Sequence, residues 1–78
     1  MNKKIKVYGV PGCPFCKRTR EYFKGKDLKF EDIDVAANHD LAKEMVEKSG
    51  QMSVPVIEID GEIVIGFDRD EIEKILGS

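Results

Sequence analysis

Two cysteines are the residues best suited to chemistry in this chain. Cys13 and Cys16 are the only cysteines among 78 residues, and two residues separate them. A strand-like stretch at residues 5–8 precedes the pair, and a helix-like stretch at residues 17–24 follows it. Two thiols three positions apart at a helix start lie on one face, within reach of a disulfide. This context favours a redox-active pair.

The position of Cys13 favours its thiolate, which is the reactive form of a thiol. The first turn of a helix has unpaired N–H groups and the positive end of the helix dipole. Pro14 fits this turn because its missing N–H has no partner to lose there. We therefore expect Cys13 to attack a disulfide, and Cys16, one turn deeper, to resolve the mixed disulfide by intramolecular attack.

Two other interpretations of the cysteines remain open. A zinc site needs four ligands, and the sequence offers two cysteines, one His39 and carboxylates. We expect His39 to be a solvated surface residue, because no second His or Cys lies near it in the sequence. A purely structural disulfide would close a very short loop, so it would add little stability.

The composition is that of one soluble globular domain covering residues 1–78. Apolar residues make up 41% and charged residues 36%, and the net charge is -2. This balance predicts no binding to nucleic acid. We expect no membrane span and no signal peptide, because apolar runs are short and Gly9 and Pro11 interrupt the first one. The sequence therefore predicts a cytoplasmic protein. In that reducing compartment, paired cysteines are more often catalytic than structural.

Periodicity and turn residues predict the element order β-α-β-α-β-β-α. In an α/β chain of this order we expect one mixed four-stranded sheet with helices on both faces, the first two strands being parallel. Gly25 and Gly50 are expected to end the first two helices. Asn38 and Asp40 are candidate caps for the start of the second helix, and Asp68 is expected to cap the last one. Asp60-Gly61 predicts a hairpin turn. The predicted segments are strands at 4–10, 28–35, 54–59 and 62–65, and helices at about 14–24, 39–49 and 69–76.

Ser53-Val54-Pro55 forms a second candidate site at the start of the third strand. Proline cannot donate to a sheet ladder, so it belongs at a strand start, and an X-Pro bond can be cis. The backbone N–H and C=O of Val54 could pair with an extended substrate peptide, as in strand addition. The alternative is an ordinary loop proline.

Taken together, these motifs resemble the glutaredoxins, within the thioredoxin-fold superfamily. They occur in the right order over almost the whole chain, which makes the resemblance specific. The residues that carry it are Tyr8, Cys13-Pro14-Phe15-Cys16, Ser49-Gly50-Gln51, Ser53-Val54-Pro55-Val56, Ile59-Asp60-Gly61 and Gly66-Phe67-Asp68.

The resemblance implies a thioredoxin-like fold, a cis Val54–Pro55 bond, and Cys13 as nucleophile with Cys16 as resolving thiol. It implies no bound cofactor and no metal ligands. The partners it implies are proteins with disulfides, and an electron donor that is either glutathione or a flavoprotein like thioredoxin reductase. The substrate-binding residues that it implies are Tyr8, Pro14, Phe15, Ser53, Val54, Pro55, Gly66, Phe67 and Asp68.

Departures from the family pattern bear on the electron donor. Glutaredoxins commonly have a cation at the position of Val10, and a basic or polar residue at that of Met52. Ile65-Gly66 replaces their usual Gly-Gly pair, whereas Asp68 is kept to meet the amino end of glutathione. Gly66-Phe67 also resembles the hydrogen-donor redoxins of ribonucleotide reductase, which thioredoxin reductase reduces. We therefore expect weak dependence on glutathione. Lys17, near the cysteines, acts against this expectation if it replaces the cation that is absent at Val10.

The predicted function is a monomeric dithiol electron carrier that reduces protein disulfides or glutathione mixed disulfides. One alternative is an iron–sulfur or metal carrier of the same fold. Pro14 favours the redox type, since cluster carriers mostly have one cysteine or a different residue there. A non-catalytic binding domain is the other alternative, and the presence of both cysteines argues against it.

Overall fold

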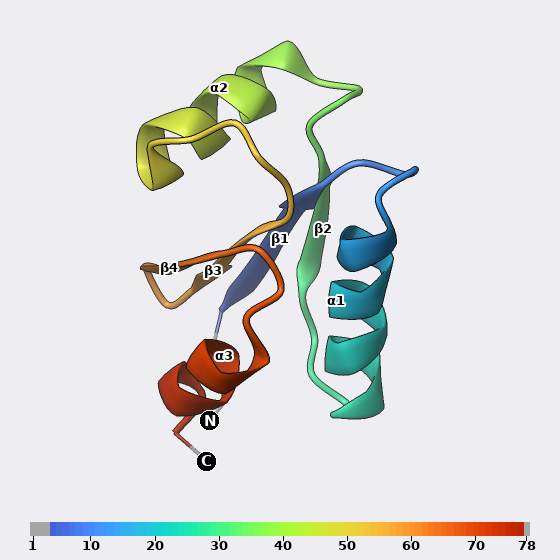
Figure 1. Cartoon of the computed structure of the whole chain (residues 1–78), viewed down its shortest axis with the longest axis vertical. Helices are drawn as coiled ribbons and strands as arrows, with labels where there is room; N and C mark the ends of the chain where they lie inside the picture. The colour runs from blue at the N-terminus through green and yellow to red at the C-terminus, as the bar shows by residue number, and fades with distance from the viewer. Residues whose placement is uncertain (1–3, 78) are drawn as a thin grey trace.

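A four-stranded mixed sheet lies at the centre of the molecule (Figure 1). The structure is a computed structural model, and it describes residues 4–77. The strand order is β2-β1-β3-β4. β1 is parallel to β2 and antiparallel to β3, which is antiparallel to β4. The elements in chain order are β1 (Ile5–Gly9), α1 (Pro14–Gly25), β2 (Glu31–Asp34), α2 (His39–Ser49), β3 (Val56–Ile59), β4 (Glu62–Ile65) and α3 (Arg69–Ile75).

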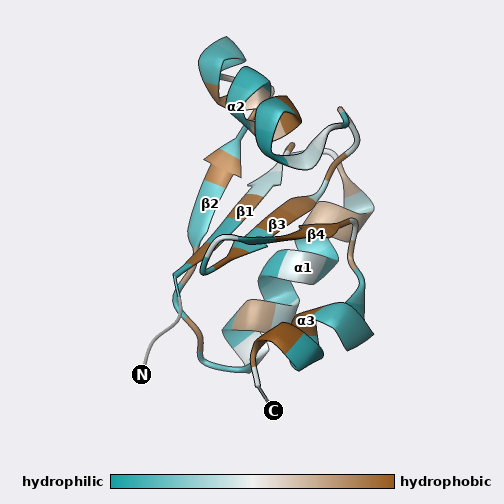
Figure 2. Cartoon of the chain, turned by 90° about the vertical axis from the view of Figure 1, so that its left-hand side faces the viewer, coloured by the Kyte–Doolittle hydropathy of each residue, from teal (hydrophilic) through white to brown (hydrophobic). Residues whose placement is uncertain are grey.

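Helices cover both faces of the sheet, as the sequence predicted (Figures 1 and 2). On one face, Phe23 of α1 and Ile72 of α3 are fully buried with Val7 and other apolar strand residues. On the other face, Met45 of α2 packs with Tyr8 and further strand residues. Successive residues of a strand point to opposite faces, so Val7 and Tyr8 supply the two cores in turn. The thioredoxin-like fold is therefore confirmed.

The second strand begins later than its apolar residues suggested. The predicted segment was 28–35, whereas β2 is Glu31–Asp34. The chain leaves α1 through left-handed Asp27, and the N–H of Leu28 donates to the carbonyl of Phe23 at 3.0 Å. Leu28 and Phe30 then pack against the core from this connection rather than from the sheet. These two apolar residues thus belong to the connection between α1 and β2 and not to the strand.

Two other boundaries differ from the predicted ones, the end of α1 and the start of β3. Gly25 lies inside the last turn of α1, and Lys26 is the C-terminal cap. The left-handed residue of this cap is Asp27, because the bonds to Phe23 and Lys24 require it there. β3 begins at Val56 and not at 54, because Pro55 has no N–H to donate to the sheet. The carbonyl of Pro55 still accepts from the N–H of Gly66, just beyond the end of β4.

The remaining caps agree with the sequence. Asn38 accepts hydrogen bonds from the N–H groups of Asp40 and Leu41 at the start of α2, and left-handed Gly50 ends that helix. Asp68 accepts from the N–H of Glu71 at the start of α3. None of the helices in residues 4–77 is long and apolar enough to span a membrane.

Lys48 ties α2 to the sheet. Its Nζ donates to Oε1 of Glu58 at 2.8 Å and to the hydroxyl of Tyr8 at 3.3 Å, and it lies 3.6 Å from Oε1 of Glu44. The hydrogen bond to Glu58 raises the pKa of Lys48. Partial burial acts in the opposite direction, and the contact with Tyr8 adds to the rise. The charged form of Lys48 therefore stabilises the fold.

We predict that Lys48→Met lowers the free energy of unfolding by about 1 kcal/mol, because Glu58 and Tyr8 lose a charged donor. The folded-state pKa of Lys48 is raised, so its contribution is complete at neutral pH and is lost as the pH rises through that pKa. Urea unfolding at pH 7 measures the change. Lys43→Met, an exposed lysine on the same helix, is the control, and equal unfolding midpoints for the two variants would contradict the prediction.

Candidate functional site

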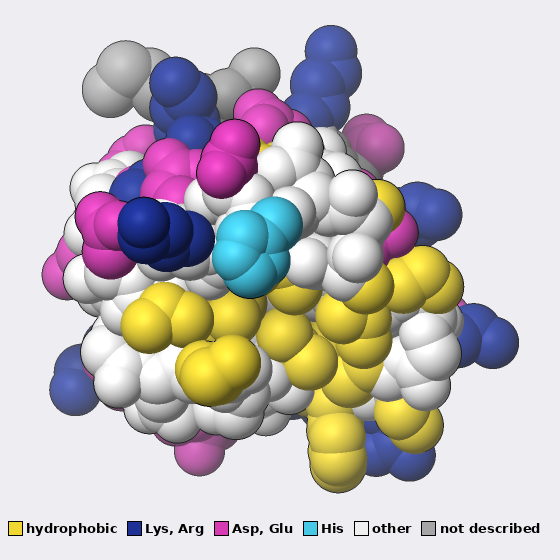
Figure 3. Space-filling view, turned by 90° about the horizontal axis from the view of Figure 1, so that it is seen from above, with side chains coloured by type: hydrophobic (Ala, Val, Ile, Leu, Met, Phe, Trp, Pro, Cys, Tyr) yellow, Lys and Arg dark blue, Asp and Glu magenta, His cyan; other side chains and the backbone are white. Residues whose placement is uncertain are grey.

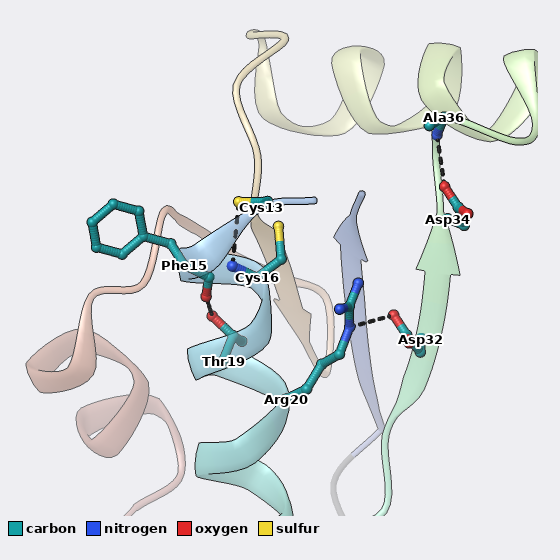
Figure 4. A network of polar contacts seen from close by, with 8 residues as sticks. All are labelled: Cys13, Phe15, Cys16, Thr19, Arg20, Asp32, Asp34 and Ala36. Atoms are coloured by element: carbon teal, nitrogen blue, oxygen red, sulfur yellow. Dashed lines mark hydrogen bonds and ion pairs between the residues drawn. The ribbon is translucent and has the colours of Figure 1, made fainter. Parts of the chain in front are cut away.

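Cys13 and Cys16 meet at the start of α1 (Figure 4). A turn follows β1, in which the N–H of Cys13 donates to the carbonyl of Val10 at 3.3 Å. Cys13 is the N-terminal cap of α1, and its Sγ accepts a hydrogen bond from the N–H of Cys16 at 3.3 Å. Pro14 occupies the first helical position, as predicted. Both cysteines are reduced.

The two thiols have different surroundings. Cys13 is partly exposed, whereas Cys16 is completely buried. Burial alone would raise the pKa of Cys13, but the hydrogen bonds from Cys16 and from the backbone N–H of Phe15, together with the charge of Arg20, lower it. Burial and the hydrogen bond to Cys13 raise the pKa of Cys16 to about 11. Cys13 is thus the better thiolate, and Cys16 is held as a thiol behind it.

Near the thiols, α1 also carries the buried Thr19 and the exposed Phe15. Thr19 is fully buried, and its hydroxyl donates to the carbonyl of Phe15 at 2.8 Å. Phe15 itself is 55% exposed, and the guanidinium of Arg18 lies 5.7 Å from the centre of its ring. Phe15 therefore does not pack in the core. It projects from the site, and there it can contact another molecule.

The Ser53–Pro55 segment adjoins the Gly66–Asp68 segment. The Val54–Pro55 bond is cis, and the Pro55 carbonyl accepts from the N–H of Gly66 at 2.8 Å. Gly66 has a φ of 75°, a left-handed conformation that favours glycine. Ser53 is exposed, and its hydroxyl donates to Oε1 of Gln51 at 2.7 Å.

The other predicted site residues lie as follows. Val54 is half-buried, and Pro55 is fully buried. Phe67 is partly buried and packs edge-on against Tyr22, with ring centres 5.6 Å apart. Asp68 is exposed and caps α3. Tyr8 has no exposed surface, and Lys48 holds its hydroxyl on the α2 side of the sheet.

Two residues near the thiols were not singled out from the sequence. Gly9 packs directly against Cys16, where a Cβ would lie 2.7 Å from Sγ. Arg20 acts on both thiols, and its Nε donates to Oδ1 of Asp32 at 3.0 Å. The spacing from Cys16 to Arg20 is one helical turn, so it would have placed Arg20 on the thiol's side of α1.

Hydrophobic side chains gather on the face seen in Figure 3, beside the single histidine, His39. Met52 is 81% exposed, and it lines a groove of about 340 Å³ with residues of α2 that include His39 and Val46. His39 is exposed, as the sequence predicted. Across residues 4–77, no group of three or more His, Cys, Asp or Glu side chains could hold a metal ion.

A partly exposed cysteine with a lowered pKa at a helix start, backed by a buried thiol in a thioredoxin-like fold, defines a thiol–disulfide oxidoreductase. The chain belongs to the glutaredoxin family, since residues 5–64 match the family model described as Glutaredoxin. The resemblance inferred from the sequence is thereby confirmed.

Several relatives support the same assignment. A glutaredoxin-like 8.6 kDa protein in the rubredoxin operon of Clostridium pasteurianum, itself uncharacterised, is 47% identical, with 92% of this chain and 96% of that protein covered. Glutaredoxin 3 of Escherichia coli K12 is 30% identical, with 82% and 77% covered. The crystal structure of a glutaredoxin from Archaeoglobus fulgidus has a TM-score of 0.88 and 26% identity, with 97% and 88% covered.

We predict that iodoacetamide at mildly acidic pH modifies Cys13 before Cys16. The pKa of Cys13 is lowered and that of Cys16 is raised to about 11, so Cys13 has the larger thiolate fraction at any given pH. Peptide mapping after short exposures measures both rates. In urea the two rates should converge, because the folded surroundings are lost. Faster modification of Cys16 in the folded protein would contradict the assignment.

Proposed function

We propose that this chain is a dithiol electron carrier of the cytoplasm, acting as a monomer, that reduces disulfides of proteins. The observation that carries the proposal is the pairing of the two cysteines. Cys13 is partly exposed and has a lowered pKa, and the buried Cys16 donates its backbone N–H to Sγ of Cys13. The Cys13 thiolate attacks one sulfur of the substrate disulfide, and a mixed disulfide forms while the other sulfur leaves. Cys16 then attacks Cys13, which releases the second substrate thiol and leaves a Cys13–Cys16 disulfide.

The surroundings of Cys13 favour a protein as substrate. Phe15, Met52 and Ile65 are exposed apolar side chains near the ends of the elements that carry the candidate site. Such side chains bind protein surfaces better than they bind a small charged tripeptide. We assign the Val54 backbone to pairing with an extended substrate segment, with Pro14, Ser53 and Pro55 lining the same site and Tyr8 supporting it from within the core.

For the electron donor, we propose a flavoprotein like thioredoxin reductase rather than glutathione. Glutathione carries two carboxylates and an ammonium, so its site needs matching charges. Val10 is uncharged where the family commonly has a cation, and Met52 is apolar. Ile65 adds bulk where the family has glycine. Asp68 remains available at the start of α3, with Gly66 and Phe67 beside it, but its Oδ1 is already bonded to the N–H of Glu71.

An iron–sulfur carrier is the second candidate function. No observation in the described residues favours it over the dithiol carrier, and Pro14 is typical of the redox type. Colour and iron content of the purified protein would separate the two.

We predict that Cys16→Ser traps a covalent complex with a protein disulfide substrate, whereas Cys13→Ser forms none. Without the second thiol, the mixed disulfide at Cys13 has no intramolecular attacker. Non-reducing electrophoresis and mass spectrometry of the two variants with oxidised insulin measure the complex. A Cys16→Ser variant that turns over at the wild-type rate would refute the dithiol mechanism.

We predict that reduction of bis(2-hydroxyethyl) disulfide is faster with NADPH and thioredoxin reductase than with glutathione and glutathione reductase. Val10→Lys should raise kcat/KM for glutathione by roughly three- to tenfold, because it restores one charged contact. Glu62→Gln makes the same change of net charge at the hairpin end of β4 and is the control. Efficient turnover with glutathione and none with the flavoprotein would overturn this choice of donor.

A further inference from the structure

Gly9 gives Cys16 and Arg20 a shared space. A Cβ at Gly9 would lie 2.7 Å from Sγ of Cys16 and 3.5 Å from Nη2 of Arg20. The buried thiol and the guanidinium therefore both border the same point above β1. Figure 4 shows both side chains on the side of α1 that faces the sheet. A side chain at residue 9 would displace the thiol, so this proximity depends on glycine.

Asp32 holds Arg20 in this position. Nε of Arg20 donates to Oδ1 of Asp32 at 3.0 Å, and the Arg20 side chain is only 18% exposed while that of Asp32 is 50% exposed. Water therefore screens the carboxylate more than it screens the guanidinium. The positive charge of Arg20 acts on the protein side of this ion pair, where Cys16 lies.

Among the described residues around Cys16, Arg20 is the cation that acts on its thiol. β1 contributes the uncharged Gly9, and the N–H of Val10, just after β1, favours the thiolate of Cys16. On β2, Asp32 is paired with Arg20, and Asp34 accepts from the N–H groups of Ala36 and Ala37. Cys13, the cap of α1, is a further ionisable neighbour in the described residues, and it loses its charge once it joins a mixed disulfide.

We propose that Arg20 is a positioning residue for the second step of exchange, in which its guanidinium stabilises the Cys16 thiolate as that sulfur attacks Cys13. This inference rests on the proposed function, in which Cys16 resolves the mixed disulfide. Cys16 gives its proton to solvent and forms a bond to Sγ of Cys13. The bond between Cys13 and the substrate sulfur breaks, and that sulfur leaves as a thiolate with the electron pair. Arg20 exchanges neither proton nor electron.

The stabilisation matters because burial, the largest cause of the raised pKa of Cys16 in the dithiol, also disfavours its thiolate in the mixed disulfide. A positive charge that borders the same space as Sγ of Cys16 increases the fraction of Cys16 that is ionised near neutral pH. A lower pKa also reduces intrinsic nucleophilicity, so the net gain in rate is smaller than the gain in thiolate fraction. The gain disappears at alkaline pH, where the thiol ionises without help.

The test separates the two steps of exchange in single turnovers. Reduced protein in excess reacts with 4,4′-dithiodipyridine, a neutral disulfide, so the first thiopyridone reports attack by Cys13 and the second reports attack by Cys16. We expect Arg20→Met to slow the second release about threefold at neutral pH. The two rates should converge at alkaline pH, and Arg20→Lys should restore most of the rate. Lys24→Met removes one charge from the exposed side of α1 and is the control.

Each outcome decides one question. No second thiopyridone from the wild type would overturn the proposed function and this inference with it. A second release with the wild-type pH profile in Arg20→Met would overturn the role of Arg20 alone. A loss of rate that is equal at every pH, or that Arg20→Lys does not restore, would show that Arg20 only supports the packing of α1 and would also overturn its assigned role.

Discussion

The hydrogen bond from the N–H of Cys16 to Sγ of Cys13 is the interaction on which the site depends. It requires Cys13 outside the first turn of α1 and Cys16 inside it. The turn after β1 provides the first condition, through the bond between Cys13 and Val10. The burial of Cys16, Thr19 and Phe23 against the sheet provides the second, because α1 cannot rotate without exposing its apolar side. The core therefore sets the geometry of the thiols.

Different degrees of burial give two chemically identical side chains different pKa values and different roles. Helix N–H groups reach the partly exposed Cys13 and lower its pKa, whereas Cys16 is enclosed by the sheet and its pKa rises. An attacking thiol should be ionised before its substrate arrives, and a resolving thiol should not compete with it. Gly9 contributes to this division, since it lets the chain pass close enough to enclose Cys16 without displacing it.

Much of this arrangement could be predicted from the sequence, because it depends on local patterns. Helix caps at Asn38 and Asp68 and the spacing of the cysteines act over a few residues. The start of β2 could not be predicted, because Leu28 packs in the core from a connection and periodicity does not distinguish the two cases. Arg20 and Gly9 were not predicted as site residues for another reason. Spacing alone places Arg20 on the side of Cys16, but the importance of both residues comes from contacts of α1 with β1 and β2.

The position of β2 at the edge of the sheet has a consequence for self-association. Three of its four residues, Glu31, Asp32 and Asp34, are acidic, and no strand within residues 4–77 pairs with its outer backbone. An unpaired strand edge is a template on which another chain can add a strand, and natural proteins protect such edges with charge. A second copy that aligned its own β2 here would bring like carboxylates together. The acidity of β2 thus opposes aggregation through its open edge.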